Sequence, residues 1–196
     1  MRRLSAIILS LFLSATLAWS AETEKMDPEN ILMIELAGEA NGIVEVELLP
    51  EVAPEHVARV KRLAREGYYN DVAFHRVIEG YMAQTGDVQH GKREGYLRRY
   101  AGIGGSVYPD LKAEFSDIPF DRGVLGMARS PDPNSANSQF FIMFDAGYFL
   151  NGQYTVFGRV IDGMDLVDAI KKGDQSQNGS VSEPDFMKRV WIKADE

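Results

Sequence analysis

The chain contains no cysteine in its 196 residues. Disulfide bonds, thiolate nucleophiles and cysteine-containing metal sites are therefore excluded. Histidine is scarce as well: His56, His75 and His90 are scattered, without a spacing typical of metal ligands. No set of serine, histidine and aspartate of the kind that hydrolases use is apparent. We therefore expect neither a metal ion nor a cofactor.

Positive charge is in deficit, because 21 lysines and arginines stand against 29 aspartates and glutamates, and the formal net charge is −8. An acidic chain without a block of basic residues lacks the positive face that binding to a phosphate backbone requires. The one basic cluster comprises Lys92, Arg93, Arg98 and Arg99, and we interpret it as a solvated loop. We expect no nucleic-acid partner.

Long hydrophobic runs are absent except near the N-terminus, between residues 4 and 18. This run of about 15 residues falls short of the roughly 20 that span a bilayer, which argues against an uncleaved membrane anchor. It follows a positively charged Met-Arg-Arg start and precedes small residues, Ala18 and Ser20, at the −3 and −1 positions of a cut before Ala21. We expect residues 1–20 to be a signal peptide cleaved after Ser20. The mature chain would then be periplasmic or secreted, without stable membrane insertion.

Hydrophobic patterning divides the remainder into a polar leader over 21–30, expected to be flexible, and one domain over 31–196. An apolar run at 31–37 predicts a strand, and Asn41-Gly42 predicts a two-residue hairpin turn. The following strand alternates Val44, Val46 and Leu48 with glutamates, which is typical of a half-buried antiparallel strand.

Two segments have the pattern of helices. Residues 54–66 begin with Pro54, carry an apolar stripe and end before Gly67. A shorter helix is predicted over 163–172, before Gly173. Further short strands are predicted over 72–78, 81–88, 123–129, 138–144, 154–160 and 186–193. Short strands with only two helices indicate a closed antiparallel barrel or a sandwich.

Three segments hold the residues that suggest a chemistry: 74–87 (FHRVIEGYMAQTGD), 127–142 (with MARS and SQFFI) and 149–158 (FLNGQYTVFG). Arg76 shares a strand face with Phe74 and Ile78, an unusual place for an arginine without a partner. Apolar side chains large enough to line a groove are Tyr81, Met82, Phe141, Phe149, Leu150 and Tyr154. Arg76 could instead be a salt-bridged structural residue, and the aromatics could be plain core. The residues alone therefore indicate a peptide or ligand groove with one arginine.

The same segments resemble the signature of cyclophilins, which are peptidyl-prolyl cis-trans isomerases. FHRVIxGYMxQxGD, SQFFI and VFGRV occur in the family's order within residues 31–193. The resemblance implies a mainly β fold, a closed antiparallel β-barrel of eight strands capped by two α-helices. It also implies isomerase activity on X-Pro bonds of proline-containing polypeptides, as in exported bacterial relatives. We expect a monomer.

Roles for individual residues follow only from this resemblance. It implies that Arg76 is the catalytic residue. The residues implied to bind substrate are Phe74, Tyr81, Met82, Gln84, Ala128, Arg129, Gln139, Phe141, Phe149, Leu150 and Tyr154. Among them, Gln84 and Gln139 would lie along the substrate backbone, and Ala128 with Arg129 would accept the residue before proline.

The sequence departs from many cyclophilins in three places. Phe149 stands where many have the tryptophan tied to tight cyclosporin binding, so we expect weak binding of that drug. Tyr154 replaces a commoner histidine. The loop over 88–105 is longer than usual and keeps only Gly102, Gly104 and Gly105 of its glycine-rich character. A phosphate-binding loop is disfavoured there, because the lysine followed by serine or threonine is missing.

Two functions of different class therefore remain at this point. One is an enzyme that isomerises X-Pro bonds, and the other is a binding module that keeps the groove but has lost turnover. Modules of the second kind tend to lose the arginine or the aromatic residues, and this sequence retains both.

Overall fold

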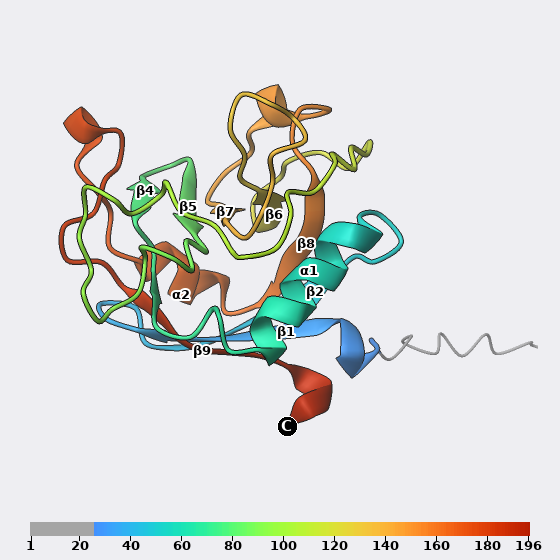
Figure 1. The fold of residues 1–196 in the computed structure, drawn as a ribbon, viewed down its shortest axis with the longest axis horizontal. Helices are drawn as coiled ribbons and strands as arrows, with labels where there is room; N and C mark the ends of the chain where they lie inside the picture. Colours follow the sequence, from blue (N-terminus) through green and yellow to red (C-terminus); the bar gives the residue numbers. More distant parts are fainter. Residues whose placement is uncertain (1–25) are drawn as a thin grey trace, which may run out of the picture.

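Nine strands form a single sheet in residues 26–196, the part of the chain that the computed structural model describes (Figure 1). The strands are β1 Ile31–Ala37, β2 Gly42–Leu48, β3 Val72–Ala73, β4 Arg76–Ile78, β5 Met82–Thr85, β6 Val124–Met127, β7 Phe140–Met143, β8 Val156–Asp162 and β9 Phe186–Ile192. They are hydrogen-bonded in the order β3-β9-β1-β2-β8-β6-β7-β5-β4, and neighbouring strands are antiparallel. Every predicted strand segment overlaps at least one of them.

The sheet has two ends, so the prediction of a closed barrel of eight strands is corrected to an open, barrel-like sheet of nine. The predicted strand over 72–78 breaks into β3 and β4, which form the two ends and are separated in the chain only by Phe74 and His75. At the break, the N–H of Phe74 donates to the carbonyl of Asp185, and His75 accepts from the N–H of Val181. These hydrogen bonds to a loop take the place of bonds to a neighbouring strand. As a result β3 pairs with β9, whereas β4 pairs with β5.

The hairpin of β1 and β2 confirms the alternating pattern, since Val44, Val46 and Leu48 are buried. Its turn is wider than the predicted two residues, because Leu36 pairs with Gly42 and the chain between them forms the connection. The carboxylate of Asp185 accepts from two N–H groups of that connection, which holds the wider loop in place.

Helix α1 (Pro54–Arg65) confirms the first predicted helix, and Val57, Val60 and Leu63 are buried on one side of it. Two N–H groups of its first turn donate to the carboxylate of Glu114, which satisfies donors that a helix leaves unpaired. The helix contacts β9.

Helix α2 (Met164–Ala169) is shorter than the predicted 163–172. Ile170 adopts an extended conformation and is fully buried, and the next N–H, from Lys171, donates to Asp185 at 2.8 Å. Burial of Ile170 and this hydrogen bond take the chain out of the helix early. α2 contacts β2.

Residues 1–25, which include the predicted signal peptide and its cleavage site, lie outside the described residues. The last residues of the predicted leader over 21–30, Pro28–Asn30, form a 3-10 helix. Arg65 on α1 makes ion pairs with Glu29 and with Asp195 near the C-terminus, at 2.7 and 2.9 Å. The folded domain therefore begins before residue 31.

In β5, β6, β7 and β8, alternate residues point to opposite faces of the sheet, and a hydrophobic core lies on each face. Phe140 and Ile142 of β7 belong to the larger core, together with residues of both helices. Phe141 and Met143 of the same strand point to the other face and join a smaller cluster with Met82 of β5. The candidate site lies on this second face.

Candidate active site

Strand pairing places Arg76 between Gln84 and the loop that contains Ser180, which is distant in sequence. In β4, Arg76 pairs with Gln84 of β5, and Gln84 in turn pairs with Phe141 of β7. On its other side, Arg76 forms an isolated bridge with Ser180. The arginine therefore projects from a short strand that is held on both edges.

The Arg76 guanidinium is oriented by neutral oxygen acceptors. Its Nε donates to the backbone carbonyl of Asn178 at 3.1 Å, and one terminal nitrogen donates to the side-chain Oδ1 of Asn178 at 3.0 Å. The other terminal nitrogen donates to Oε1 of Gln84 at 3.1 Å. A guanidinium carries five N–H donors, so two of them lack an oxygen or nitrogen acceptor within residues 26–196, and one terminal nitrogen also faces the weak acceptor Met82 Sδ at 3.8 Å.

The charge of Arg76 is not compensated by a carboxylate in the described part of the chain, where none lies within 4.0 Å of it. Within residues 26–196, Arg76 is therefore not a salt-bridged structural residue. Partial burial lowers the pKa of Arg76 from its usual value, while Tyr81 and Tyr154 act in the opposite direction. An arginine nevertheless remains protonated at neutral pH.

A pocket of about 130 Å³ opens beside the guanidinium, and we call it the apolar pocket after its wall of Met82, Phe141 and Leu150. Its lining residues are Arg76, Tyr81, Met82, Gln84, Ala128, Arg129, Phe141, Leu150 and Tyr154. The Phe141 ring, which lines the pocket, belongs to a group of three packed aromatic rings. It stacks on the Phe120 ring with centroids 5.7 Å apart and meets the Tyr154 ring edge-on with centroids 5.8 Å apart. Gly126 makes room for this arrangement, because a Cβ there would lie 2.4 Å from the Phe141 ring.

Arg129 is the second cation of the pocket, but four of its five N–H donors have oxygen acceptors. Two of its nitrogens donate to the carbonyl of Gln153, at 3.1 and 2.8 Å. The third donates to the carbonyls of Ser130 and Pro131, at 2.9 and 3.3 Å. Its guanidinium lies over the Tyr154 ring, 4.4 Å from the centroid. Arg129 therefore forms part of the wall, whereas Arg76 keeps free donors.

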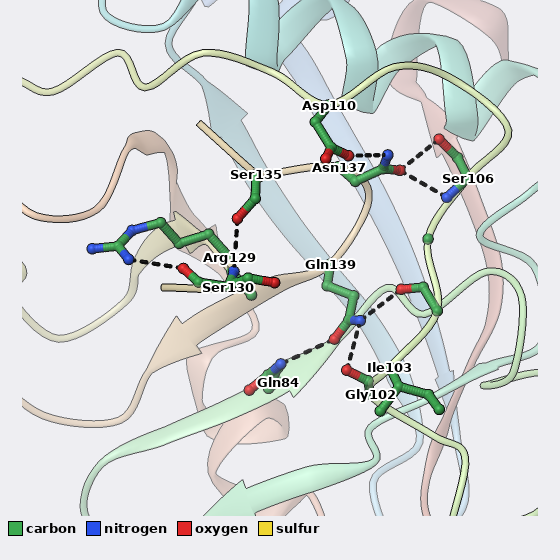
Figure 2. A pocket seen from close by; sticks show the side chains of 13 residues that line it. Gln84, Gly102, Ile103, Ser106, Asp110, Arg129, Ser130, Ser135, Asn137 and Gln139 are labelled. Atoms are coloured by element: carbon green, nitrogen blue, oxygen red, sulfur yellow. Dashed lines mark hydrogen bonds between the residues drawn. The ribbon is translucent and has the colours of Figure 1, made fainter. Parts of the chain in front are cut away.

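A chain of side-chain amides connects Arg76 with a second, polar cavity, and Figure 2 shows the part of it that runs from Gln84 through Gln139 to Gly102. Gln84 Nε2 donates to Oε1 of Gln139 at 3.0 Å, and Gln139 Nε2 donates to the carbonyls of Gly102 and Gly104 at 3.0 and 2.8 Å. These bonds fix which end of each amide faces which neighbour. The cavity, of about 520 Å³, shares Gln84, Ala128 and Arg129 with the apolar pocket.

The loop that supplies these carbonyls is held in place by the buried carboxylate of Asp87. One carboxylate oxygen of Asp87 accepts from the N–H groups of Gly102 and Gly104, at 2.8 and 3.0 Å. The other accepts from the N–H groups of Gln89 and His90. The side chain of Asp87 is thus satisfied by backbone donors, which gives the loop a defined position beside Gln139.

Most of the residues that the resemblance implied for the site come together. Nine of them line the apolar pocket, and Gln139 lines the adjoining polar cavity. Phe149 is 65% exposed at the rim, where its ring contacts that of Tyr81 with centroids 5.6 Å apart. Phe74 is the exception: it is 1% exposed in the larger core, because the chain breaks between β3 and β4 and separates it from Arg76.

Sequence reasoning missed Asn178, the residue that accepts two hydrogen bonds from Arg76. It lies 102 positions further along the chain and adopts a left-handed conformation with φ of 55°, which asparagine tolerates better than most residues. The Asn-Gly pair at 178–179 marks a turn, but nothing in the sequence connects that turn with Arg76.

Residues 26–196 offer neither a cluster of metal-ligating side chains nor a helix suited to crossing a membrane. No group of three or more histidine, cysteine, aspartate or glutamate side chains there is arranged to hold a metal ion. Within the same residues, no helix has the length and apolar character needed to cross a membrane.

Comparison with known proteins agrees with this geometry. The family model "cyclophilin type peptidyl-prolyl cis-trans isomerase/CLD" matches residues 32–192. A probable peptidyl-prolyl cis-trans isomerase of Brucella suis biovar 1 is 54% identical over 192 residues, which cover 97% of this chain and 96% of the relative.

Solved structures of similar fold include cyclophilin AquaCyp293 from Hirschia baltica. It has a TM-score of 0.73 and 26% identity, and the match covers 87% of this chain and 76% of that one. A Cryptosporidium parvum cyclophilin-type isomerase, crystallised in the presence of the dipeptide Ala-Pro, has a TM-score of 0.69 and 28% identity, covering 83% and 98%. With its fold, its sequence and its groove in agreement, the chain belongs to the cyclophilin-type peptidyl-prolyl cis-trans isomerases.

Proposed function

We propose that this isomerase acts on X-Pro bonds of exported polypeptides and thereby assists their folding, with Arg76 as the catalytic residue. The observation that carries the catalytic assignment is the Arg76 guanidinium, which is uncompensated, oriented by neutral acceptors and provided with free donors beside an apolar pocket. The enzyme class itself follows from the family.

The physical problem is the rotation of a stiff bond. Amide resonance gives the peptide C–N bond a rotational barrier of about 18–20 kcal/mol. X-Pro isomerisation without a catalyst therefore takes tens to hundreds of seconds, which is slow enough to limit folding. A catalyst must bind the twisted bond better than either planar isomer.

The geometry supports such differential binding. When the bond twists, the lone pair of the prolyl nitrogen is no longer delocalised and can accept a hydrogen bond. A free N–H of Arg76 would donate to it, while the pocket formed by Met82, Phe141 and Leu150 holds the pyrrolidine ring. The acceptors on Gln84 and Asn178 keep the guanidinium in place, so little reorganisation is needed as the bond turns.

The same pocket supports proline-containing polypeptides as substrates. The carbonyl group of the residue before proline would turn at the edge formed by Ala128 and Arg129, which is the boundary between the apolar pocket and the polar cavity. The related Cryptosporidium enzyme was crystallised with Ala-Pro, which is consistent with this choice of substrate.

Export is proposed from the sequence alone, on the positively charged start, the apolar run and the small residues before Ala21. The full chain should be expressed in a Gram-negative host, fractionated and weighed intact by mass spectrometry. A periplasmic or secreted protein that begins at Ala21 is expected. Full-length protein in the cytosol or the membrane would contradict export.

The role in folding is tested with the exported protein itself. A client whose refolding has a slow phase limited by an X-Pro bond should lose that phase when the enzyme is added. The Arg76→Ala variant is the control and should leave the phase slow. If both proteins accelerate refolding equally, the assistance does not depend on the proposed catalytic residue.

A further inference from the structure

The segment 92–104 contains the basic cluster and does not line the apolar pocket. It nevertheless contacts the neighbours of both residues that accept hydrogen bonds from Arg76 through oxygen, Asn178 and Gln84. On its first side it packs against the chain that leads into β9. The hydroxyl of Tyr96 donates to the carbonyl of Val181 at 3.0 Å, and the Arg93 guanidinium lies over the Phe186 ring at 4.4 Å. The segment therefore follows the loop that contains Asn178.

The contact nearest to Asn178 is made by Arg98. Its guanidinium donates to Oε1 of Gln177 at 2.7 Å, and Gln177 directly precedes Asn178. The amide nitrogen of Gln177 donates to Asp174 at 3.0 Å, so the side chain is held at both ends. Arg98 is exposed and lines neither cavity, so it has no contact of its own with the proposed substrate site.

The loop that Arg98 holds presents Asn178 to the active site. It is a short 3-10 helix, Gln175–Gln177, that ends at the left-handed Asn178. The N–H of Gly179 closes the turn on the carbonyl of Asp174 at 2.8 Å. The two acceptors of Arg76, the carbonyl and the Oδ1 of Asn178, depend on this turn.

The second side of the segment ends at the amide chain. Gly102 and Gly104 accept both hydrogen bonds from Gln139, which orients Gln84, the remaining acceptor of Arg76. One segment thus supports all three hydrogen bonds from the guanidinium to oxygen, from the sides of Asn178 and of Gln84, without a hydrogen bond of its own to Arg76.

We propose that segment 92–104 is a clamp that positions the Arg76 guanidinium, and that Arg98 is the positioning residue on the side of Asn178. The inference rests on the proposed catalytic role of Arg76. Loss of Arg98 lets the turn at 175–178 move, so the guanidinium spends less time in the orientation in which its free donors face the substrate. Substrate affinity is unaffected, because the pocket is intact.

The test compares Arg98→Ala with Arg99→Ala, which removes a neighbouring exposed charge whose contact is with the Tyr100 ring. We expect Arg98→Ala to lower kcat/KM about three- to tenfold, the loss typical of one hydrogen bond, with the peptide Kd within about twofold of the wild type. Arg99→Ala should match the wild type. Arg98→Lys should recover most of the activity, and Gln177→Ala, which removes the acceptor, should repeat the loss.

Adding Arg98→Ala to the Arg76→Ala variant distinguishes a positioning role of Arg98 from a general structural role. In Arg76→Ala, residual turnover measured by NMR exchange at high enzyme concentration should not change when Arg98→Ala is added. An additional loss of the same size would overturn the clamp, and so would equal activity of Arg98→Ala and Arg99→Ala. If Arg76→Ala itself keeps wild-type turnover, the proposed catalytic assignment fails instead, which distinguishes the two failures.

Discussion

The side-chain carbonyl oxygen of Gln84 accepts a hydrogen bond from the Arg76 guanidinium at 3.1 Å. Because the amide nitrogen of Gln84 donates to Gln139, the carbonyl end must face Arg76. A neutral acceptor orients the guanidinium and leaves its charge uncompensated. This combination is what hydrogen bonding to a prolyl nitrogen requires.

Replacing that acceptor with a carboxylate should damage catalysis. In Gln84→Glu the new charge pairs with Arg76, and the Oε1 of Gln139 loses its donor. We expect kcat/KM to fall about tenfold or more, and further than in Gln84→Met, which removes the acceptor but adds no charge. The two variants are compared in a prolyl isomerisation assay. A Gln84→Glu enzyme as active as the wild type would show that charge compensation is irrelevant.

Phe149 should limit affinity for cyclosporin. Its ring is largely exposed beside Tyr81, and it offers no N–H donor. Phe149→Trp adds an indole N–H and apolar area, which should strengthen binding by roughly 1–3 kcal/mol, or about ten- to a hundredfold in Kd. Calorimetric titration of both proteins measures this difference. If the tryptophan variant binds no more tightly, the residue at 149 does not set the affinity.

Acid should destabilise the fold through His75, which is 4% exposed. Burial lowers its pKa from 6.5 to about 4, against the opposing influence of Asp87. Between these values the unfolded chain binds a proton that the folded chain does not, so the free energy of unfolding falls as the pH falls. Above 6.5 and below about 4 the two states bind equally, and His75 contributes no slope.

Denaturant unfolding of the wild type and of His75→Gln, from pH 7.5 to 4, isolates this contribution, since all carboxylates are common to both. The wild type should lose up to about 3 kcal/mol more than the variant across the range. Parallel stability curves for the two proteins would show that His75 is not the group responsible.

Local patterns were sufficient for much of the fold. The alternation of Val44, Val46 and Leu48 and the helix that begins at Pro54 reflect interactions between near neighbours in the sequence, and the structure confirms both. The residues alone indicated an apolar groove with one arginine, but the role of each residue came only from the family resemblance. Their convergence depends on the pairing of β5 with β7, which local sequence does not reveal.

The remaining features depend on contacts between distant parts of the chain. Phe74 looked like a neighbour of Arg76, but Asp185 and Val181 break the strand between them. Asp185 also widens the first hairpin, and Arg65 orders residues that the composition marked as a leader. Asn178 reaches Arg76 across 102 positions. None of these partners can be paired from local sequence.

The most direct test of the central claim is the turnover of Arg76 variants. If the oriented guanidinium stabilises the twisted bond, Arg76→Ala should lose a few kcal/mol of transition-state stabilisation, roughly a hundredfold or more in kcat/KM. Arg76→Lys should be nearly as poor, because the three N–H groups of an ammonium cannot replace two bonds to Asn178, one to Gln84 and one to substrate. Peptide Kd should change much less. Near wild-type turnover in Arg76→Lys would refute the role of guanidinium geometry, and full activity in Arg76→Ala would refute the catalytic assignment.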